Sequence, residues 1–184
     1  TGGWRYDIRR VGNWILEEPI HFIDLARWYM AAQGEPETVY ARASSRQPDH
    51  PELQDNFSTI ISFGGGGYAV VTQTLAAFEH HCTCKVCGTT GAIWAHWSAP
   101  DARSPKAVFG LRYGNHEHIE EVAFPEMTGE VVELQQQIDA LVRAINTGSP
   151  PAVSGSDGRW AVRMCLAAQA SVERGLPVKI SEVH

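Results

Sequence analysis

Three ionisable side chains lie at helical spacing near the start of the chain. Glu17 and His21 are four residues apart, and Asp24 follows His21 by three. Residues at this spacing share one face of a helix. A carboxylate beside an imidazole supports proton transfer, because it fixes the tautomer of the ring and stabilises its protonated form. His21 and Glu17 are therefore candidates for acid–base catalysis. The alternative is a hydrogen-bonded histidine with a structural role, since ionisable pairs are often structural.

Three of the four cysteines form a second candidate cluster, in the run HHCTCKVC. Cysteine and histidine are the usual ligands of zinc. In a strand, however, Cys82 and Cys84 point to one face and Cys87 to the other. No second CxxC follows to complete four ligands. We therefore expect reduced cysteines in a strand, and no metal site.

The stretch Gly12–Met30, GNWILEEPIHFIDLARWYM, must position the first cluster. Its apolar residues recur at helical spacing and predict a core-facing side. These residues are Leu16, Ile20, Ile23 and Met30. Pro19 either opens the main helix, where its missing N–H costs nothing, or kinks a helix that begins near Asn13. Residues 1–11 are expected to be extended or loop.

The middle of the chain reads as about seven strands with short connections. The run 38–44 alternates in polarity, and three further pairs of runs surround turn sequences. The pairs are 57–63 with 68–75 around GGGG, 83–87 with 92–97 around GTTG, and 107–113 with 118–124 around GNHE. Pairs of this kind predict hairpins, and therefore a mainly antiparallel sheet.

Two helices are predicted after the strands. Residues 130–147 follow the rhythm of an amphipathic helix. A second helix is predicted over 157–174, with Ser156 or Asp157 as the cap and with 160–172 apolar on most of its surface. The tail sequence VKI can add a short strand. The predicted fold class is α+β: an open-faced, mainly antiparallel sheet with helices 14–31, 130–147 and 157–174 packed against one face. No domain boundary is clear, so residues 1–184 are read as one domain.

Composition limits the possible partners. The 184 residues are 43% hydrophobic and 20% charged, with a net charge of -6. These values are typical of a globular domain and give no sign of a nucleic-acid or anionic-membrane surface. No apolar run approaches the roughly 18 residues of a membrane span. The N-terminus has neither an initiator Met nor the apolar core of a signal peptide. We expect a cytoplasmic protein whose chain starts inside a longer one.

Three blocks of the sequence resemble the C-terminal domain of the glucose–fructose oxidoreductase / inositol dehydrogenase (Gfo/Idh/MocA) family of NAD(P)-dependent oxidoreductases. The blocks are GNWILEEPIHFIDLARW, KVCGTTGAI, and LVRAINTGSPPAVSGSDGRWAV followed by SVERGLPVKI. They span nearly the whole chain in the order expected for that family. The resemblance implies a second domain with an open-faced sheet, preceded in the family by a Rossmann domain. No strand–GxGxxG–helix occurs in residues 1–184.

The resemblance also implies roles for individual residues. His21 matches the catalytic histidine of the family, and Glu17 matches a position usually held by Asp. Its longer arm would shift the carboxylate, and enzymes are sensitive to displacements of about 1 Å. Four residues lie in segments that line the substrate pocket of the family: Trp4, Arg5, Asn13 and Trp14. A ring for a sugar face and a cation for hydroxyl groups fit that use, and ordinary packing is the alternative for each.

The expected parent protein is a dehydrogenase of a sugar, polyol or related hydroxyl compound. NAD or NADP would bind mainly to the Rossmann domain that this chain lacks, so the fragment alone is expected to be inactive. The open face of the sheet is expected to form a homodimer, as is common in the family. Two alternatives remain: a non-catalytic binding or oligomerisation module, and a domain of an NAD-assisted glycoside hydrolase.

Overall fold

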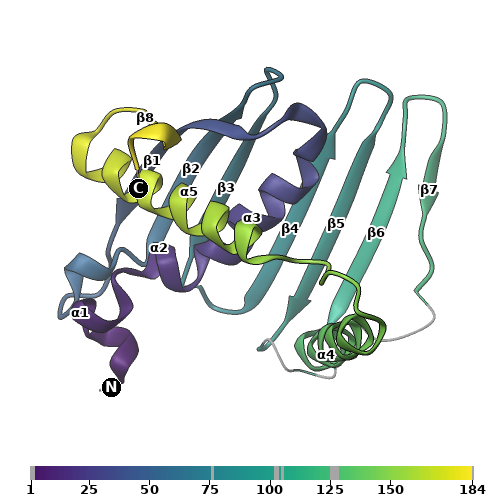
Figure 1. Cartoon of the computed structure of the whole chain (residues 1–184), viewed down its shortest axis with the longest axis horizontal. Coiled ribbons are helices and arrows are strands. Elements are labelled where there is room, and N and C mark those ends of the chain that lie inside the picture. Colours follow the sequence, from purple (N-terminus) through teal and green to yellow (C-terminus); the bar gives the residue numbers. More distant parts are fainter. Residues whose placement is uncertain (1–2, 76, 102–103, 105, 125–128, 184) are drawn as a thin grey trace. The chain divides into compact units, whose positions relative to one another are not determined.

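The computed structural model describes residues 3–75, 77–101, 104, 106–124 and 129–183. The chain divides into two compact units, the first built from residues up to 76 and from 153 onward, the second from 77–152. Each unit contains its own four-stranded antiparallel sheet (Figure 1). The predicted α+β class is confirmed.

The first sheet has the strand order β3-β2-β1-β8. Its strands are β1 (Pro36–Ser44), β2 (Asn56–Phe63), β3 (Tyr68–Thr74) and β8 (Val178–Lys179). The predicted hairpin around GGGG is present, and Gly66 supplies the positive φ of 88° that the turn requires. The predicted tail strand pairs with β1.

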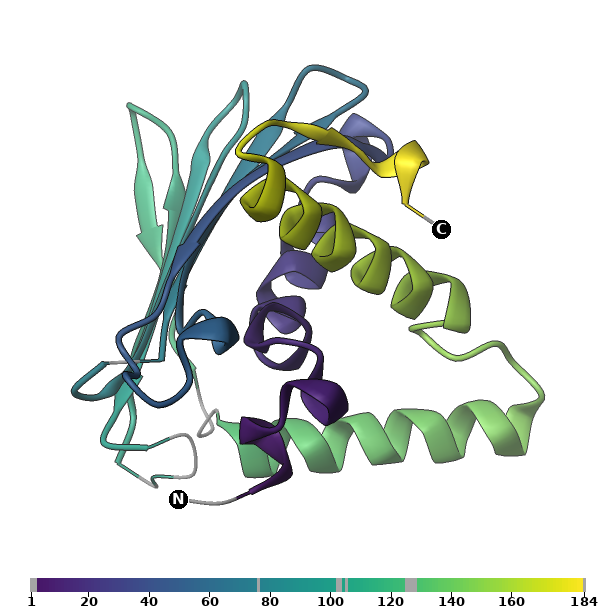
Figure 2. The same cartoon turned by 90° about the vertical axis from the view of Figure 1, so that its left-hand side faces the viewer.

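Helices cover one face of this sheet. Figure 2 shows α3 (Pro19–Tyr29) and α5 (Gly155–Arg174) on the same side of β1–β3. Alternate residues of the strands point toward these helices, and Ile61 is fully buried while its neighbour Ile60 is exposed. The Ser171 hydroxyl links the layers, because it accepts from the Ala41 N–H at 2.9 Å and donates to the Leu176 carbonyl at 2.7 Å.

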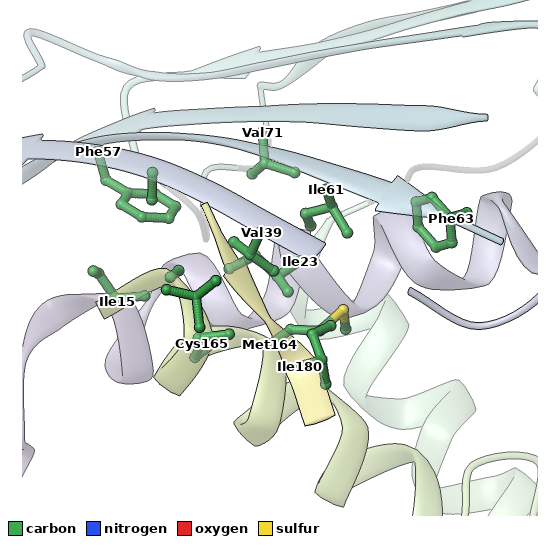
Figure 3. Packing of buried hydrophobic residues seen from close by; sticks show 14 residues of the cluster. Ile15, Ile23, Val39, Phe57, Ile61, Phe63, Val71, Met164, Cys165 and Ile180 are labelled. Carbon is green, nitrogen blue, oxygen red and sulfur yellow. The ribbon is translucent and has the colours of Figure 1, made fainter. Parts of the chain in front are cut away.

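The core between sheet and helices is apolar (Figure 3). It contains residues from both the strands and the helices that face one another in the first unit. They include Ile15, Ile23, Val39, Phe57, Ile61, Phe63, Val71, Met164, Cys165 and Ile180. Burial of this set is the main favourable term that holds the elements together.

The N-terminal part differs from the prediction in two ways. The expected helix 14–31 is two helices, α2 (Trp14–Glu17) and α3; of the two alternatives for Pro19, the first is confirmed, because Pro19 opens the main helix. Residues 1–11 were expected to lack helix, but the described ones form a 3₁₀ turn, η1 (Trp4–Tyr6), and a short helix, α1 (Ile8–Val11). Thr1 and Gly2 lie outside the described residues. The other 3₁₀ turns are η2 (Ala31–Gln33), η3 (Pro51–Leu53) and η4 (Ile180–Glu182).

The second unit holds the other two predicted hairpins. Its strands are β4 (His80–Cys87), β5 (Ala92–Ala99), β6 (Val108–Gly114) and β7 (Ile119–Glu121), in sequential order. The helix α4 (Glu130–Thr147) has the predicted bounds, but its apolar stripe is exposed rather than packed on a sheet. The stripe consists of Val131, Leu134, Ile138, Leu141, Val142 and Ile145. Across the described residues, no helix combines the length and the apolar character that a membrane crossing needs.

Candidate active site

The start of α2 is fixed by a side-chain cap. Asn13 is buried, and its side-chain oxygen accepts a hydrogen bond from the Leu16 N–H at 3.1 Å. Gly12 precedes it with a φ of 81°, and a Cβ there would lie 3.1 Å from the Leu16 side chain. The structure therefore gives Asn13 a structural task, and the implied contact of Asn13 with substrate stays a prediction.

A break in the helix separates the two predicted catalytic residues. Glu17 ends α2, Glu18 has non-helical dihedral angles, and Pro19 occupies the first turn of α3, which carries His21. The relation of four residues along a single helix is thereby lost. Among the described residues, no ion pair or hydrogen bond joins Glu17 to His21.

The Glu17 carboxylate instead binds Arg5. The distance from Arg5 Nε to Glu17 Oε1 is 2.8 Å, and the Glu17 side chain is 13% exposed against 62% for Arg5. The Trp14 indole N–H donates to the Arg5 carbonyl at 3.2 Å, and the Arg5 guanidinium carbon lies 5.7 Å from the centre of the Trp4 ring. Four of the six predicted site residues therefore form one contact group: Trp4, Arg5, Trp14 and Glu17.

His21 and Asp24 lie one turn apart on α3 and interact through their charges. His21 is exposed on α3, and Asp24 is half-buried one turn later. Burial raises the pKa of the Asp24 carboxyl, and Asp157 adds to the rise, whereas Arg27 and His21 lower it without cancelling the effect. The carboxylate that interacts with His21 through its charge is thus Asp24, one turn later on α3, and not Glu17.

Two aromatic residues at this site were not found from the sequence. The Tyr6 ring packs edge-on against Trp14, with ring centres 5.7 Å apart, and its centre lies 5.1 Å from that of His50. His50 Nδ1 in turn lies 3.6 Å from Glu52 Oε1. His50 belongs to the loop before β2, so no local spacing could connect it with Tyr6.

The cysteine run follows the predicted strand alternation. Cys82 and Cys84 share the partly buried face of β4, whereas Cys87 is exposed on the other face. Burial raises the pKa of the Cys84 thiol. In the part of the chain that the structure describes, no group of three or more His, Cys, Asp or Glu side chains is placed to hold a metal ion.

The predicted site residues differ in their exposure to solvent. Trp4 is 49% exposed and His21 is also exposed. An open groove of about 570 Å³ lies elsewhere on the first unit, lined by residues that include Glu37, Trp160, Arg163 and Lys179. None of the predicted site residues lines it. Trp4 and His21 are therefore open to solvent, whereas Trp14 and Glu17 are mostly buried.

The sequence matches one family model. Residues 1–94, just over half of the 184, match the model described as the GFO/IDH/MocA C-terminal domain. This chain belongs to the GFO/IDH/MocA C-terminal domain family. The family predicted from the three sequence blocks is confirmed.

A relative of this GFO/IDH/MocA domain is the myo-inositol 2-dehydrogenase of Thermotoga maritima. The two are 27% identical over 180 residues, which cover 96% of this chain and 52% of the relative. The chain thus spans about half the length of the relative it matches.

Solved structures share the GFO/IDH/MocA fold. The aldose–aldose oxidoreductase of Caulobacter crescentus, solved with glycerol, has a TM-score of 0.75 at 22% identity, covering 96% of this chain and 50% of that one. An oxidoreductase of Agrobacterium radiobacter, solved with NAD⁺, L-tartaric acid and magnesium, has a TM-score of 0.66 at 18% identity, covering 90% and 48%. At these identities the likeness shows the fold.

Proposed function

We propose that this chain is the substrate-side half of an NAD(P)-dependent oxidoreductase that acts on a sugar, a polyol or a related hydroxyl compound. The family membership and the named activity of the Thermotoga relative support this assignment. The observation that carries it is the exposed His21 imidazole on α3, one turn before the half-buried Asp24. An exposed imidazole can reach a substrate, and a neighbouring carboxylate stabilises its protonated form.

The described residues do not fit a dinucleotide. A pyrophosphate needs a glycine-rich turn that leads from a strand into the N-terminus of a helix. The glycines at 64–67 lead from β2 into β3 instead, and they close a hairpin. We therefore assign the binding of NAD or NADP to a part of the protein outside this chain, and no redox step to the residues described.

The acid–base step falls to His21. A nitrogen of its imidazole accepts the proton of the substrate hydroxyl when that carbon is oxidised, and returns it in the reverse direction. The charge of Asp24, one turn later on α3, interacts with this ring. Glu17 stands where the family pattern has Asp, and Arg5 holds its carboxylate.

The test is a His21→Ala substitution in the full-length protein. We expect kcat to fall by about 10²–10⁴-fold, with cofactor affinity close to that of the wild type. His116→Ala is the matched control, because the His116 side chain is 88% exposed in the turn between β6 and β7 of the second unit. Near-normal turnover of His21→Ala across the pH range would assign His21 to structure and reject the proposed role.

The non-catalytic alternative has one observation in its favour. Glu17 is engaged by Arg5 and is not hydrogen-bonded to His21 in the described structure. A binding or oligomerisation module would need no such pair. In that case His21→Ala and Glu17→Gln would both leave turnover unchanged while the full-length protein still catalyses oxidation.

A further inference from the structure

The ion pair between Arg5 and Glu17 is asymmetric in exposure. Arg5 Nε lies 2.8 Å from Glu17 Oε1, a length typical of a strong charge-assisted hydrogen bond. The carboxylate is mostly removed from water, at 13% exposed, whereas the guanidinium side chain is 62% exposed. A buried carboxylate without a partner is costly, while an exposed guanidinium is solvated without one. Glu17 therefore depends on Arg5 more than Arg5 depends on Glu17.

Helix α2 contacts both the backbone carbonyl and the side chain of Arg5. Trp14, at the start of this helix, donates its indole N–H to the Arg5 carbonyl at 3.2 Å. Glu17, three residues later and on the same side of the helix, binds the side chain. The position of Trp14 depends in turn on the Asn13 cap, and the Trp4 ring lies against the guanidinium. The guanidinium is thus placed by the helix that carries the carboxylate.

We propose that Arg5 is a positioning residue, which fixes the Glu17 carboxylate where the family pattern has Asp, and not a cation that binds the substrate directly. The inference rests on the proposed function. The Nε of Arg5 is bonded to the Glu17 carboxylate without any substrate present, so this contact belongs to the protein itself. The pair also removes the rotational freedom of the longer Glu17 arm, which stands where the family pattern has Asp.

A double-mutant cycle in the full-length protein tests this role. The variants are Arg5→Ala, Glu17→Gln and their combination, measured for kcat and KM. Misplacement of a catalytic group by about 1 Å can cost up to about 10²-fold in rate. We expect each single variant to lower kcat at least about tenfold, with KM within about twofold of the wild type. The double variant should be no slower than the slower single variant, because the two changes break the same interaction.

Two further variants sharpen the result. Arg5→Lys retains the positive charge and should recover part of the lost kcat. Arg9→Ala is the matched control, since the Arg9 side chain is 87% exposed and pairs only with its neighbour Asp7 at 3.3 Å among the described interactions. Thermal unfolding of every variant checks that the fold survives. Arg5→Ala should lower the midpoint temperature of unfolding by more in the wild type than in a protein that already carries Glu17→Gln.

The outcomes separate the two proposals. A rise in KM with unchanged kcat in Arg5→Ala, or additive effects in the cycle, would show direct substrate binding and overturn the positioning role. Loss of turnover in His21→Ala would still support the proposed function in that case. Full activity of Glu17→Gln would overturn the positioning role as well, and full activity of His21→Ala would reject the acid–base function itself.

Discussion

The Arg27 guanidinium donates two parallel hydrogen bonds to the Glu35 carboxylate, from Nε to Oε2 at 2.9 Å and from Nη2 to Oε1 at 2.8 Å. Its remaining nitrogen, Nη1, donates to Asp157 Oδ1 at 3.1 Å. Arg27 lies on α3 and Asp157 in the first turn of α5, so one side chain joins the helix of the candidate site to the C-terminal helix. Asp157 also completes a capping box with Ser154.

Asp157 should stabilise the fold in a pH-dependent way. Hydrogen bonds from Ser154, followed by the bond from Arg27, lower the pKa of Asp157 to about 2 from 3.8. A group whose pKa is depressed by folding contributes stability above its unfolded pKa, and that contribution is lost as the pH falls through the folded pKa. Asp157→Asn should therefore be less stable than the wild type at pH 7, and the difference should shrink from about pH 4 toward about pH 2.

Urea unfolding between pH 7 and pH 2 measures this difference. Asp49→Asn is a suitable control, because Asp49 is exposed in the loop before β2. A gap between wild type and Asp157→Asn that is the same at every pH would contradict the electrostatic explanation.

Two adjacent isoleucines should differ sharply in their contribution to stability. Ile61 is fully buried under the helices, whereas Ile60 is 44% exposed on the opposite face of β2. Ile61→Ala should lower the free energy of unfolding by about 2–5 kcal/mol through loss of burial and a cavity. In the monomer, Ile60→Ala should cost no more than about 1 kcal/mol. Denaturant unfolding of the two variants measures these changes. Equal losses in the free energy of unfolding would mean that the strand faces are assigned wrongly.

Asn13 should act through its cap. Asn13→Ala should lower the stability by about 1 kcal/mol, because the Leu16 N–H loses its acceptor. Asn13→Asp keeps the acceptor and should retain most of the stability. Thermal unfolding of both variants, with KM measured in the full-length protein, separates the cap from substrate contact. An Asn13→Ala variant with unchanged stability but raised KM would restore the substrate-binding role.

The cysteines should react in a defined order. Burial, with a smaller effect of the Asp24 charge, raises the pKa of the Cys165 thiol to about 12. The thiolate is the reactive form, so Cys165 should resist alkylation in the folded protein at pH 8. Cys87 is exposed and should react first. Mass spectrometry of iodoacetamide adducts over time measures the order, and early modification of Cys165 would show that the core opens.

The uncovered face of the first sheet should mediate self-association. Tyr40, Ile60 and Val70 are neighbours in register on this face, and Ile60 and Val70 are 44% and 58% exposed. We expect a homodimer through this face. Sedimentation equilibrium at micromolar concentration should show a dimer for the wild type and a monomer for Ile60→Lys. A wild-type monomer would refute the interface.

Much of the fold was readable from local pattern. The alternation along 57–63 separates Ile61 from Ile60, because successive side chains of a strand point to opposite faces. The glycine and asparagine turns located all three hairpins. The predicted cap of α5 was wrong, because Ser154, and not Ser156 or Asp157, caps this helix. For α4 the spacing of the apolar residues predicted the helix, but it did not predict that these residues would be exposed.

The sequence by itself determined which side chains could do chemistry, and only the tertiary structure decided which of them meet. The spacing predicted Glu17 and His21 on one helix. In the structure a new helix begins at Pro19, between the two residues, and the Glu17 carboxylate binds Arg5. The contact of Tyr6 with His50 joins segments that lie far apart in the sequence. Periodicity specifies a residue's face within its own element, whereas the partner across a gap is selected by how whole elements pack.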